Sequence, residues 1–157
     1  SRQDLNPKVA LLGFSMGAAT AILAGAAEPS VAAVVADAPF ADLTRYLEAN
    51  FSVWTGLPAV PFNRTILAVT PILTGLQPEK VSPVQVVGKF AGRPLLLIHG
   101  EADEDIVPEN SLELQQAYPA AELLRVAGAR HVKSYQQEPV RYEAALLKFL
   151  QKVELAH

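Results

Sequence analysis

The stretch Val9–Ala24, VALLGFSMGAATAILA, decides the fold of this chain. Its first six residues form an unbroken apolar run of strand length, and the residues after Gly17 are strong helix formers. The two parts meet at Gly13–Gly17, GFSMG, so the pattern predicts a strand, a sharp turn and a helix, with Ser15 at the turn. We expect the two glycines to leave room for the strand and the helix to close on each other. The serine hydroxyl then stands at the end of the strand, beside a helix N-terminus that favours negative charge.

The same stretch admits two other interpretations. Val9–Ala27 is uncharged and mostly apolar, as in a membrane span, and Gly13 and Gly17 have the spacing of a helix-pairing motif. Ser15 is also a favourable residue for capping a helix. The change of periodicity near Ser15 and the few bulky residues argue against one continuous helix. We therefore predict no membrane span.

Composition narrows the class of protein. Half of the 157 residues are apolar, which suits one domain with a buried core. A net charge of −3 without a basic run gives no electrostatic footprint for nucleic acid. The absence of cysteine excludes disulfides and thiol chemistry. The histidines are scattered, so no metal or cofactor is expected. The polar N-terminus, Ser1–Asp4, lacks the features of a signal peptide and predicts a cytoplasmic location.

Apolar runs alternate with helical patterns along the rest of the chain. Further strands are expected at 31–36, 94–100 and 123–126, and helices at 41–49, 109–117 and from Pro139 onward. The last helix carries an apolar stripe at i, i+3, i+4, i+7, i+8 and i+11. This alternation predicts an α/β fold with about four strands in a mostly parallel sheet and helices on both faces. We expect one domain over 1–157, with a small lid or irregular insert at 50–82. The aromatic residues Phe51, Trp54 and Phe62 would pack in it.

Three chemically active side chains follow strand ends. Ser15 follows the first strand, Asp103 the third and His131 the fourth. Because parallel strands end at one edge of the sheet, we expect these side chains to converge, in the chain order that this nucleophile turn requires. Asp105, in the same loop, and Asp37, at the end of the second strand, remain alternative acids. His99 is interpreted as a structural residue that supports the acid loop.

The sequence resembles the α/β-hydrolase family, and is most similar to its prolyl-oligopeptidase-like and monoacylglycerol-lipase-like branches. The resemblance rests on GFSMG at 13–17, DAPF at 37–40, LIHG at 97–100 continuing to Pro108, and GARH at 128–131. It implies that Ser15 is the nucleophile, Asp103 the triad acid and His131 the general base. The Met16 N–H would be one oxyanion donor.

The chain departs from the family pattern ahead of the nucleophile turn. The family's sheet has further strands there, whereas this chain has only Ser1–Lys8 before its first strand. The resemblance therefore implies a partial α/β-hydrolase fold that lacks the loop carrying the second oxyanion donor. We expect the open edge of the first strand to pair in a homo-oligomer or with a complementary N-terminal fragment.

The resulting hypothesis is a serine hydrolase that cleaves a small-molecule ester, or a peptide or amide, through an acyl-enzyme and without a cofactor. The alternative is a catalytically inactive α/β module that serves binding or assembly.

Overall fold

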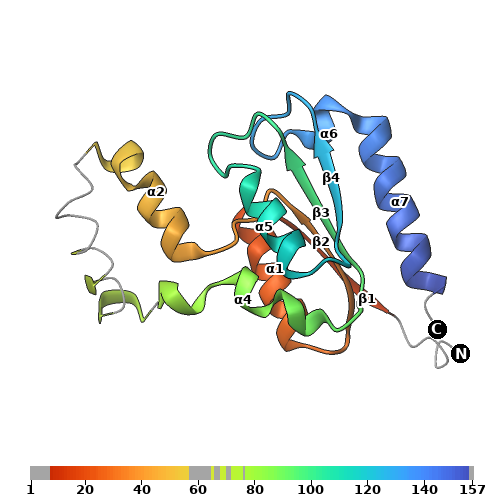
Figure 1. The fold of residues 1–157 in the computed structure, drawn as a ribbon, viewed down its shortest axis with the longest axis horizontal. Helices are drawn as coiled ribbons and strands as arrows, with labels where there is room; N and C mark the ends of the chain where they lie inside the picture. Colours follow the sequence, from red (N-terminus) through yellow and green to blue (C-terminus); the bar gives the residue numbers. More distant parts are fainter. Residues whose placement is uncertain (1–7, 57–64, 66–67, 70–71, 76, 156–157) are drawn as a thin grey trace, which may run out of the picture.

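The protein is built on a four-stranded parallel sheet (Figure 1). The computed structural model describes residues 8–56, 65, 68–69, 72–75 and 77–155. The order of the strands in the sheet is their order in the chain: β1 (Val9–Phe14), β2 (Val31–Asp37), β3 (Leu95–Gly100) and β4 (Glu122–Val126). The four predicted strands are present, and the predicted α/β fold with a parallel sheet is confirmed.

The longer helices are α1 (Met16–Ala27), α2 (Leu43–Thr55), α5 (Glu109–Ala117) and α7 (Pro139–Leu155). Single helical turns are found at η1 (Pro78–Lys80), α4 (Pro83–Val86), η2 (Val87–Phe90) and α6 (Ser134–Gln137). Of the residues described, no helix is both long enough and apolar enough to cross a bilayer.

Helix α2 is longer than the sequence pattern predicts, since it continues past residue 49 to Thr55. Its start is fixed by Asp42, whose side chain accepts a hydrogen bond from the Arg45 N–H at 3.1 Å. Its end is set by Gly56 in the left-handed conformation, with φ of 67°. Residues 57–64, 66–67, 70–71 and 76 of the insert expected at 50–82, Phe62 among them, lie outside the described residues, as does the side chain of Trp54.

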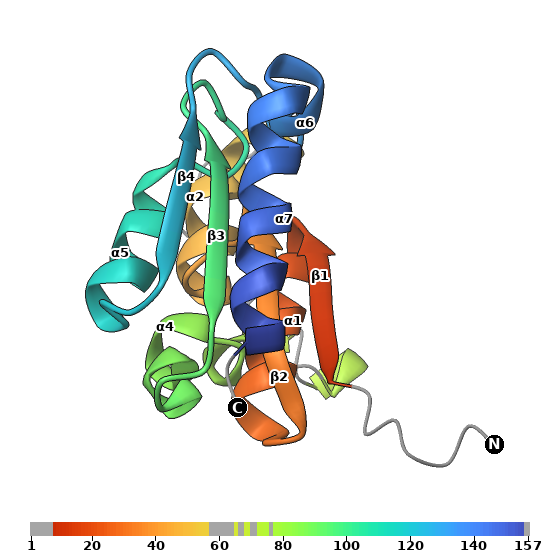
Figure 2. The same cartoon turned by 90° about the vertical axis from the view of Figure 1, so that its right-hand side faces the viewer.

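Helices cover both faces of the sheet. Helices α1 and α5, together with η2, pack on one face around a core that includes Ile22, Phe90 and Leu97. Helix α7 packs on the opposite face, where the predicted stripe buries Tyr142, Phe149 and Val153 against β2, β3 and β4. Figure 2 shows α7 in front of the sheet, with α1 and α5 behind it. Strands β2 and β3 are therefore buried on both faces.

Strand β1 forms an edge of the sheet, although its sequence is as apolar as that of a central strand (Figure 2). The exposed fractions of Val9, Leu12 and Phe14 are 49%, 50% and 45%. Among the described residues, only β2 pairs with β1. Within the described part of the chain, β1 therefore presents an apolar edge without a strand on its outer side, and such an edge favours pairing with another strand.

Candidate active site

The turn between β1 and α1 holds Ser15 in a strained conformation. Its φ of 53° lies in the left-handed region, which a residue with a side chain rarely adopts. The Ser15 N–H donates to the Asp37 carbonyl at 2.8 Å, which ties the turn to the end of β2. The Ser15 side chain makes no capping hydrogen bond to α1. The capping interpretation of this serine is therefore wrong, and its hydroxyl is available for another partner.

The two glycines of the turn have different roles. A Cβ atom added at Gly13 would lie 2.2 Å from the carbonyl oxygen of Gly17, which is fixed backbone. Only glycine fits at position 13, as expected from the sequence. A Cβ atom added at Gly17 would meet nothing within 4 Å, so the expectation that Gly17 also makes room is wrong.

Ser15, His131 and Asp103 are joined by two hydrogen bonds. His131 Nδ1 lies 2.8 Å from Asp103 Oδ2, and His131 Nε2 lies 2.9 Å from Ser15 Oγ. Because an ionised carboxylate only accepts, Nδ1 carries the ring proton, and Nε2 is left to accept from the serine hydroxyl. The structure thus brings the three residues together across sequence separations of 116 and 28 residues.

The carboxylate of Asp103 is buried and held at both oxygens. Its Oδ1 accepts from the backbone N–H groups of Asp105 and Ile106, at 3.0 and 2.9 Å, while Oδ2 faces His131. Burial by itself raises the pKa of Asp103, but the contacts with His99, the Ile106 N–H and His131 outweigh it, and the net pKa is lowered. Asp103 is therefore ionised at neutral pH.

His99 supports the acid loop from beneath. Its Nε2 lies 2.7 Å from the Ile106 carbonyl oxygen, which can only accept, so Nε2 carries the proton. Its Nδ1 then accepts from the Ser111 hydroxyl on α5, at 2.6 Å. Both side chains are buried. The sequence predicted a structural role for His99, whereas nothing in it pointed to Ser111.

The loop that carries His131 packs against the end of β3. A Cβ atom added at Gly100 would lie 2.3 Å from the carbonyl oxygen of Ala129. That carbonyl accepts from the Ala102 N–H at 2.9 Å. Gly100 thus allows the close approach that sets the distance between the acid loop and the histidine loop.

The alternative acids occupy other positions. The Asp105 backbone N–H donates to Asp103, and its own side chain is exposed. Asp37 is buried, and its Oδ2 accepts from the Tyr142 hydroxyl of α7 at 3.1 Å. Its Oδ1 has no hydrogen-bond partner in the described structure. Neither side chain is hydrogen-bonded to His131 among the described contacts. The geometry therefore favours Asp103 as the acid that pairs with His131.

The burial of Asp37 predicts a pH-dependent stability. Burial raises the pKa of Asp37 to about 6, despite the opposing hydrogen bond from Tyr142. The folded state therefore holds this proton more tightly than the unfolded state does, and stability falls as the carboxyl ionises between about pH 4 and pH 6. Asp37→Asn should remove this loss. Urea unfolding should show its free energy of unfolding gaining about 2 kcal/mol on the parent between about pH 4.5 and pH 8. A constant difference would contradict the assignment.

Two further groups in the site bear on its chemistry. Asp103, Asp105 and His131 place ligand-type atoms within 4.8 Å of one another, the one such set of three among the residues described. Within this set, the side chains of Asp103 and His131 are joined by a hydrogen bond. Met16 opens helix α1 directly after Ser15, and the first N–H groups of a helix have no intrahelical partner.

Comparisons with known proteins find similarity to one protein family and to solved structures of hydrolases. A model of the prolyl oligopeptidase family matches residues 5–155. No curated protein sequence matches. An esterase from Pyrococcus furiosus superposes with a TM-score of 0.69 at 24% identity, and the match covers 92% of this chain and 54% of the esterase. An acylaminoacyl peptidase from Pyrococcus horikoshii superposes with a TM-score of 0.66 at 20% identity, covering 93% of this chain and 24% of the peptidase. The chain thus spans about half the length of that esterase.

Proposed function

The chain belongs to the prolyl oligopeptidase family, within the α/β-hydrolases. We propose that it is a serine hydrolase whose catalytic triad is Ser15, His131 and Asp103. The observation that carries the proposal is the pair of hydrogen bonds, at 2.9 and 2.8 Å, from Ser15 through His131 to Asp103. The proposed reaction is hydrolysis of a carboxylic ester, or of a peptide or amide, through an acyl-enzyme.

Each proposed role follows from one contact. His131 Nε2 accepts the Ser15 proton as Oγ attacks the substrate carbonyl, and then returns the proton to the leaving group. Asp103 fixes the ring tautomer and stabilises the imidazolium that forms. The Met16 N–H, at the start of α1, donates to the developing oxyanion. Water then attacks the acyl-enzyme with His131 as its base.

A fluorophosphonate probe tests this proposal directly. We expect the probe to label the chain, and mass spectrometry of the digested protein to locate the label on Ser15, because His131 activates that hydroxyl. Ser15→Ala should abolish labelling, while Ser111→Ala, at the buried serine beside His99, should leave it in place if the variant folds.

Two outcomes would count against the hydrolase. Labelling that persists in Ser15→Ala would place the nucleophile elsewhere. A folded chain that the probe never labels would favour the inactive binding module over the enzyme.

We also propose that the β1 edge pairs with a strand from a second copy or from a complementary fragment. The support is the exposed apolar side chains of Val9, Leu12 and Phe14 on this unpaired edge. Sedimentation equilibrium should find a dimer or larger species. Leu12→Lys should shift it toward monomer, while Val140→Lys, at an 81% exposed position on α7, should not. A parent chain that remains monomeric and unfolds cooperatively would contradict this.

A further inference from the structure

The turn that carries His131 holds a valine in a conformation that valine rarely adopts. This histidine turn, residues 130–133, is closed by a hydrogen bond of 3.0 Å from the Lys133 N–H to the Arg130 carbonyl. Val132 is its third residue and has a φ of 53°. A positive φ at the third position is typical of a type II turn, which usually places glycine or asparagine there. For a β-branched residue such a φ is a genuine outlier, so the histidine turn is strained.

Val132 has fewer backbone restraints than the other strained residues near the site. Among the described residues, the non-glycine residues with a positive φ are Ser15, Ala38, Ala91 and Val132. The N–H groups of Ser15 and Ala38 donate to carbonyl groups of β2 and β3, each at 2.8 Å, which fixes both residues to the sheet. In the part of the chain that the structure describes, no backbone hydrogen bond joins Val132 to a strand.

The histidine turn is fixed at its ends and open in its middle. Ala129 before it and Ser134 after it are both buried. Between them, His131 and Val132 are half-buried, and the first and last residues of the turn are exposed. Figure 1 shows this segment where the chain passes from β4 to α6. The middle peptide of the turn can therefore rotate, giving Val132 a negative φ, while the two ends stay in place.

The two side-chain hydrogen bonds of His131 oppose this rotation. Its Nδ1 lies 2.8 Å from Asp103 Oδ2, and its Nε2 lies 2.9 Å from Ser15 Oγ. Rotating the peptide between His131 and Val132 changes the ψ of His131, and so carries the ring away from both partners. The free energy of one hydrogen bond and that of one strained residue are of the same order. Two bonds therefore hold the strained conformation, whereas one bond leaves the two conformations close in energy.

We propose that Val132 is a positioning residue that makes the placement of His131 depend on the hydrogen bond from Ser15. The proposal rests on the proposed function, because acylation of Ser15 is what removes this bond. An ester oxygen has no proton to donate, so in the acyl-enzyme only Asp103 holds the ring, and the strain at Val132 turns His131 away from the serine in part of the molecules.

The consequence falls on the second half of the reaction. Deacylation requires His131 Nε2 to accept a proton from the attacking water, and to return it to Ser15 Oγ as the bond from Oγ to the acyl carbon breaks. Acylation starts with both hydrogen bonds in place. Val132 therefore slows deacylation and leaves acylation nearly unaffected.

The two halves of the reaction can be timed with p-nitrophenyl acetate, since the burst of nitrophenol reports acylation and the steady rate after it reports deacylation. Val132→Gly, which removes the strain, should raise the steady rate about fivefold and change the burst rate constant by less than about twofold. We expect kcat and KM to rise together, so that kcat/KM is nearly unchanged, a pattern that a merely structural role would not produce. No gain in the steady rate, or equal gains in both rates, overturns the proposal.

Three matched variants separate strain from packing and from glycine's flexibility. Val132→Asn keeps a side chain but tolerates the left-handed region, and should reproduce the glycine result. Val132→Ala removes two methyl groups but keeps the strained Cβ, and should stay within about twofold of the parent. Ala91→Gly relieves a φ of 51° ahead of β3, at the opposite end of the sheet, and should change neither rate. The proposal falls if alanine gains as much as glycine, or if asparagine gains nothing.

A measurement without substrate tests the turn itself. The His131 Nδ1–H donated to buried Asp103 should give a low-field imidazole proton resonance in the NMR spectrum. In Ser15→Ala this resonance should weaken as the ring leaves Asp103, and adding Val132→Gly to that chain should restore it. The resonance of the His99 Nε2–H, which is held within the acid loop, should stay constant. A His131 resonance equally strong with and without the glycine overturns the proposal.

The role of Val132 and the hydrolase can fail separately. If Ser15 is labelled and the ester is turned over, but Val132→Gly changes neither rate, the hydrolase stands and the role of Val132 falls. If Ser15 is never labelled and no ester is cleaved, but the glycine restores the His131 resonance in Ser15→Ala, the proposed function falls and the control of His131 by the strained turn stands.

Discussion

Asp103→Asn is expected to lower kcat by about 10⁴-fold while the fold stays intact. An asparagine amide can donate to His131 Nδ1, which favours the ring tautomer whose Nε2 carries the proton and can no longer accept from Ser15. It also removes the negative charge that stabilises the imidazolium. The measurement is ester hydrolysis under saturating substrate, with circular dichroism and the unfolding midpoint as the check on folding.

The other two carboxylates near the site provide the controls for this result. Asp105→Asn and Asp37→Asn should each reduce kcat far less, because neither side chain is hydrogen-bonded to His131 in the described structure. Probe labelling at Ser15 should likewise be slowed in Asp103→Asn and nearly unchanged in the other two. If Asp105→Asn or Asp37→Asn proved as damaging as Asp103→Asn, the acid would have to be reassigned.

Gly13→Ala is expected to have the largest effect on stability, a loss of about 3 kcal/mol. The added Cβ would lie 2.2 and 2.4 Å from the carbonyl oxygen and carbon of Gly17, and 2.7 Å from the Ala18 nitrogen. All three atoms are backbone, so no side chain can rotate away, and β1 and α1 must separate. Urea unfolding measures the loss, and labelling at Ser15 should fall with it because the turn is displaced.

Gly17→Ala is the matched control, since it adds the same methyl group four residues later. Its Cβ would meet nothing within 4 Å, and position 17 lies in α1, where alanine is favoured over glycine by about 1 kcal/mol. The variant should be as stable as the parent or slightly more so. Equal losses in Gly13→Ala and Gly17→Ala would show that the close approach at Gly13 does not govern the turn.

The sequence predicted the fold best where the hydrophobic pattern agrees with residues, such as proline, that mark the ends of helices and strands. The apolar runs that became β1 to β3 are continuous, and Pro139 marks the start of α7. Helix α2 was predicted too short because Asn50, Ser52 and Thr55 are weak helix formers. The correct ends of α2 are marked in the sequence by its cap residues, Asp42 and Gly56. Helix α6 is a single turn, too short for any periodic pattern.

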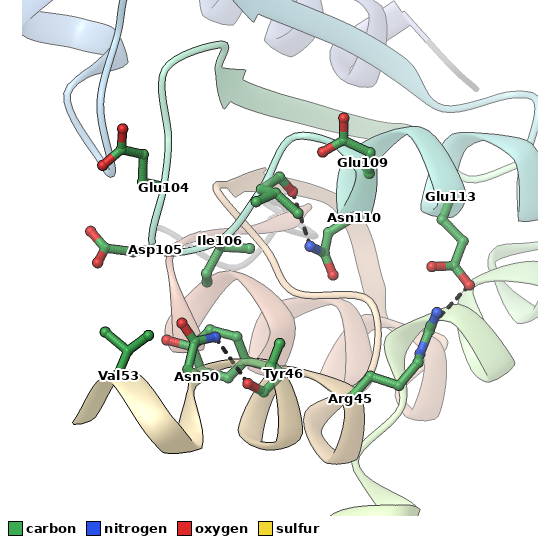
Figure 3. A pocket seen from close by; sticks show the side chains of 12 residues that line it. Arg45, Tyr46, Asn50, Val53, Glu104, Asp105, Ile106, Glu109, Asn110 and Glu113 are labelled. Carbon is green, nitrogen blue, oxygen red and sulfur yellow. Dashed lines mark hydrogen bonds and ion pairs between the residues drawn. The ribbon is translucent and has the colours of Figure 1, made fainter. Parts of the chain in front are cut away.

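The residues of the candidate site could be predicted from the sequence because each of them follows the end of a strand. The environments of these side chains could not be predicted. The raised pKa of Asp37 depends on Tyr142 and α7, which are separated from it by 105 residues. A cavity also forms where α2 meets the loop that follows Asp103 (Figure 3). The sequence of neither segment predicts it. Such properties arise from tertiary packing rather than from local pattern.

The agreement between strand order in the sheet and strand order in the chain has a consequence during synthesis. A chain emerging N-terminus first can dock each new strand on the outer side of the last, and no strand has to insert between two that are already paired. His131 lies 116 residues after Ser15 in the chain and follows β4. During synthesis, all four described strands are therefore translated before the proposed triad can be completed.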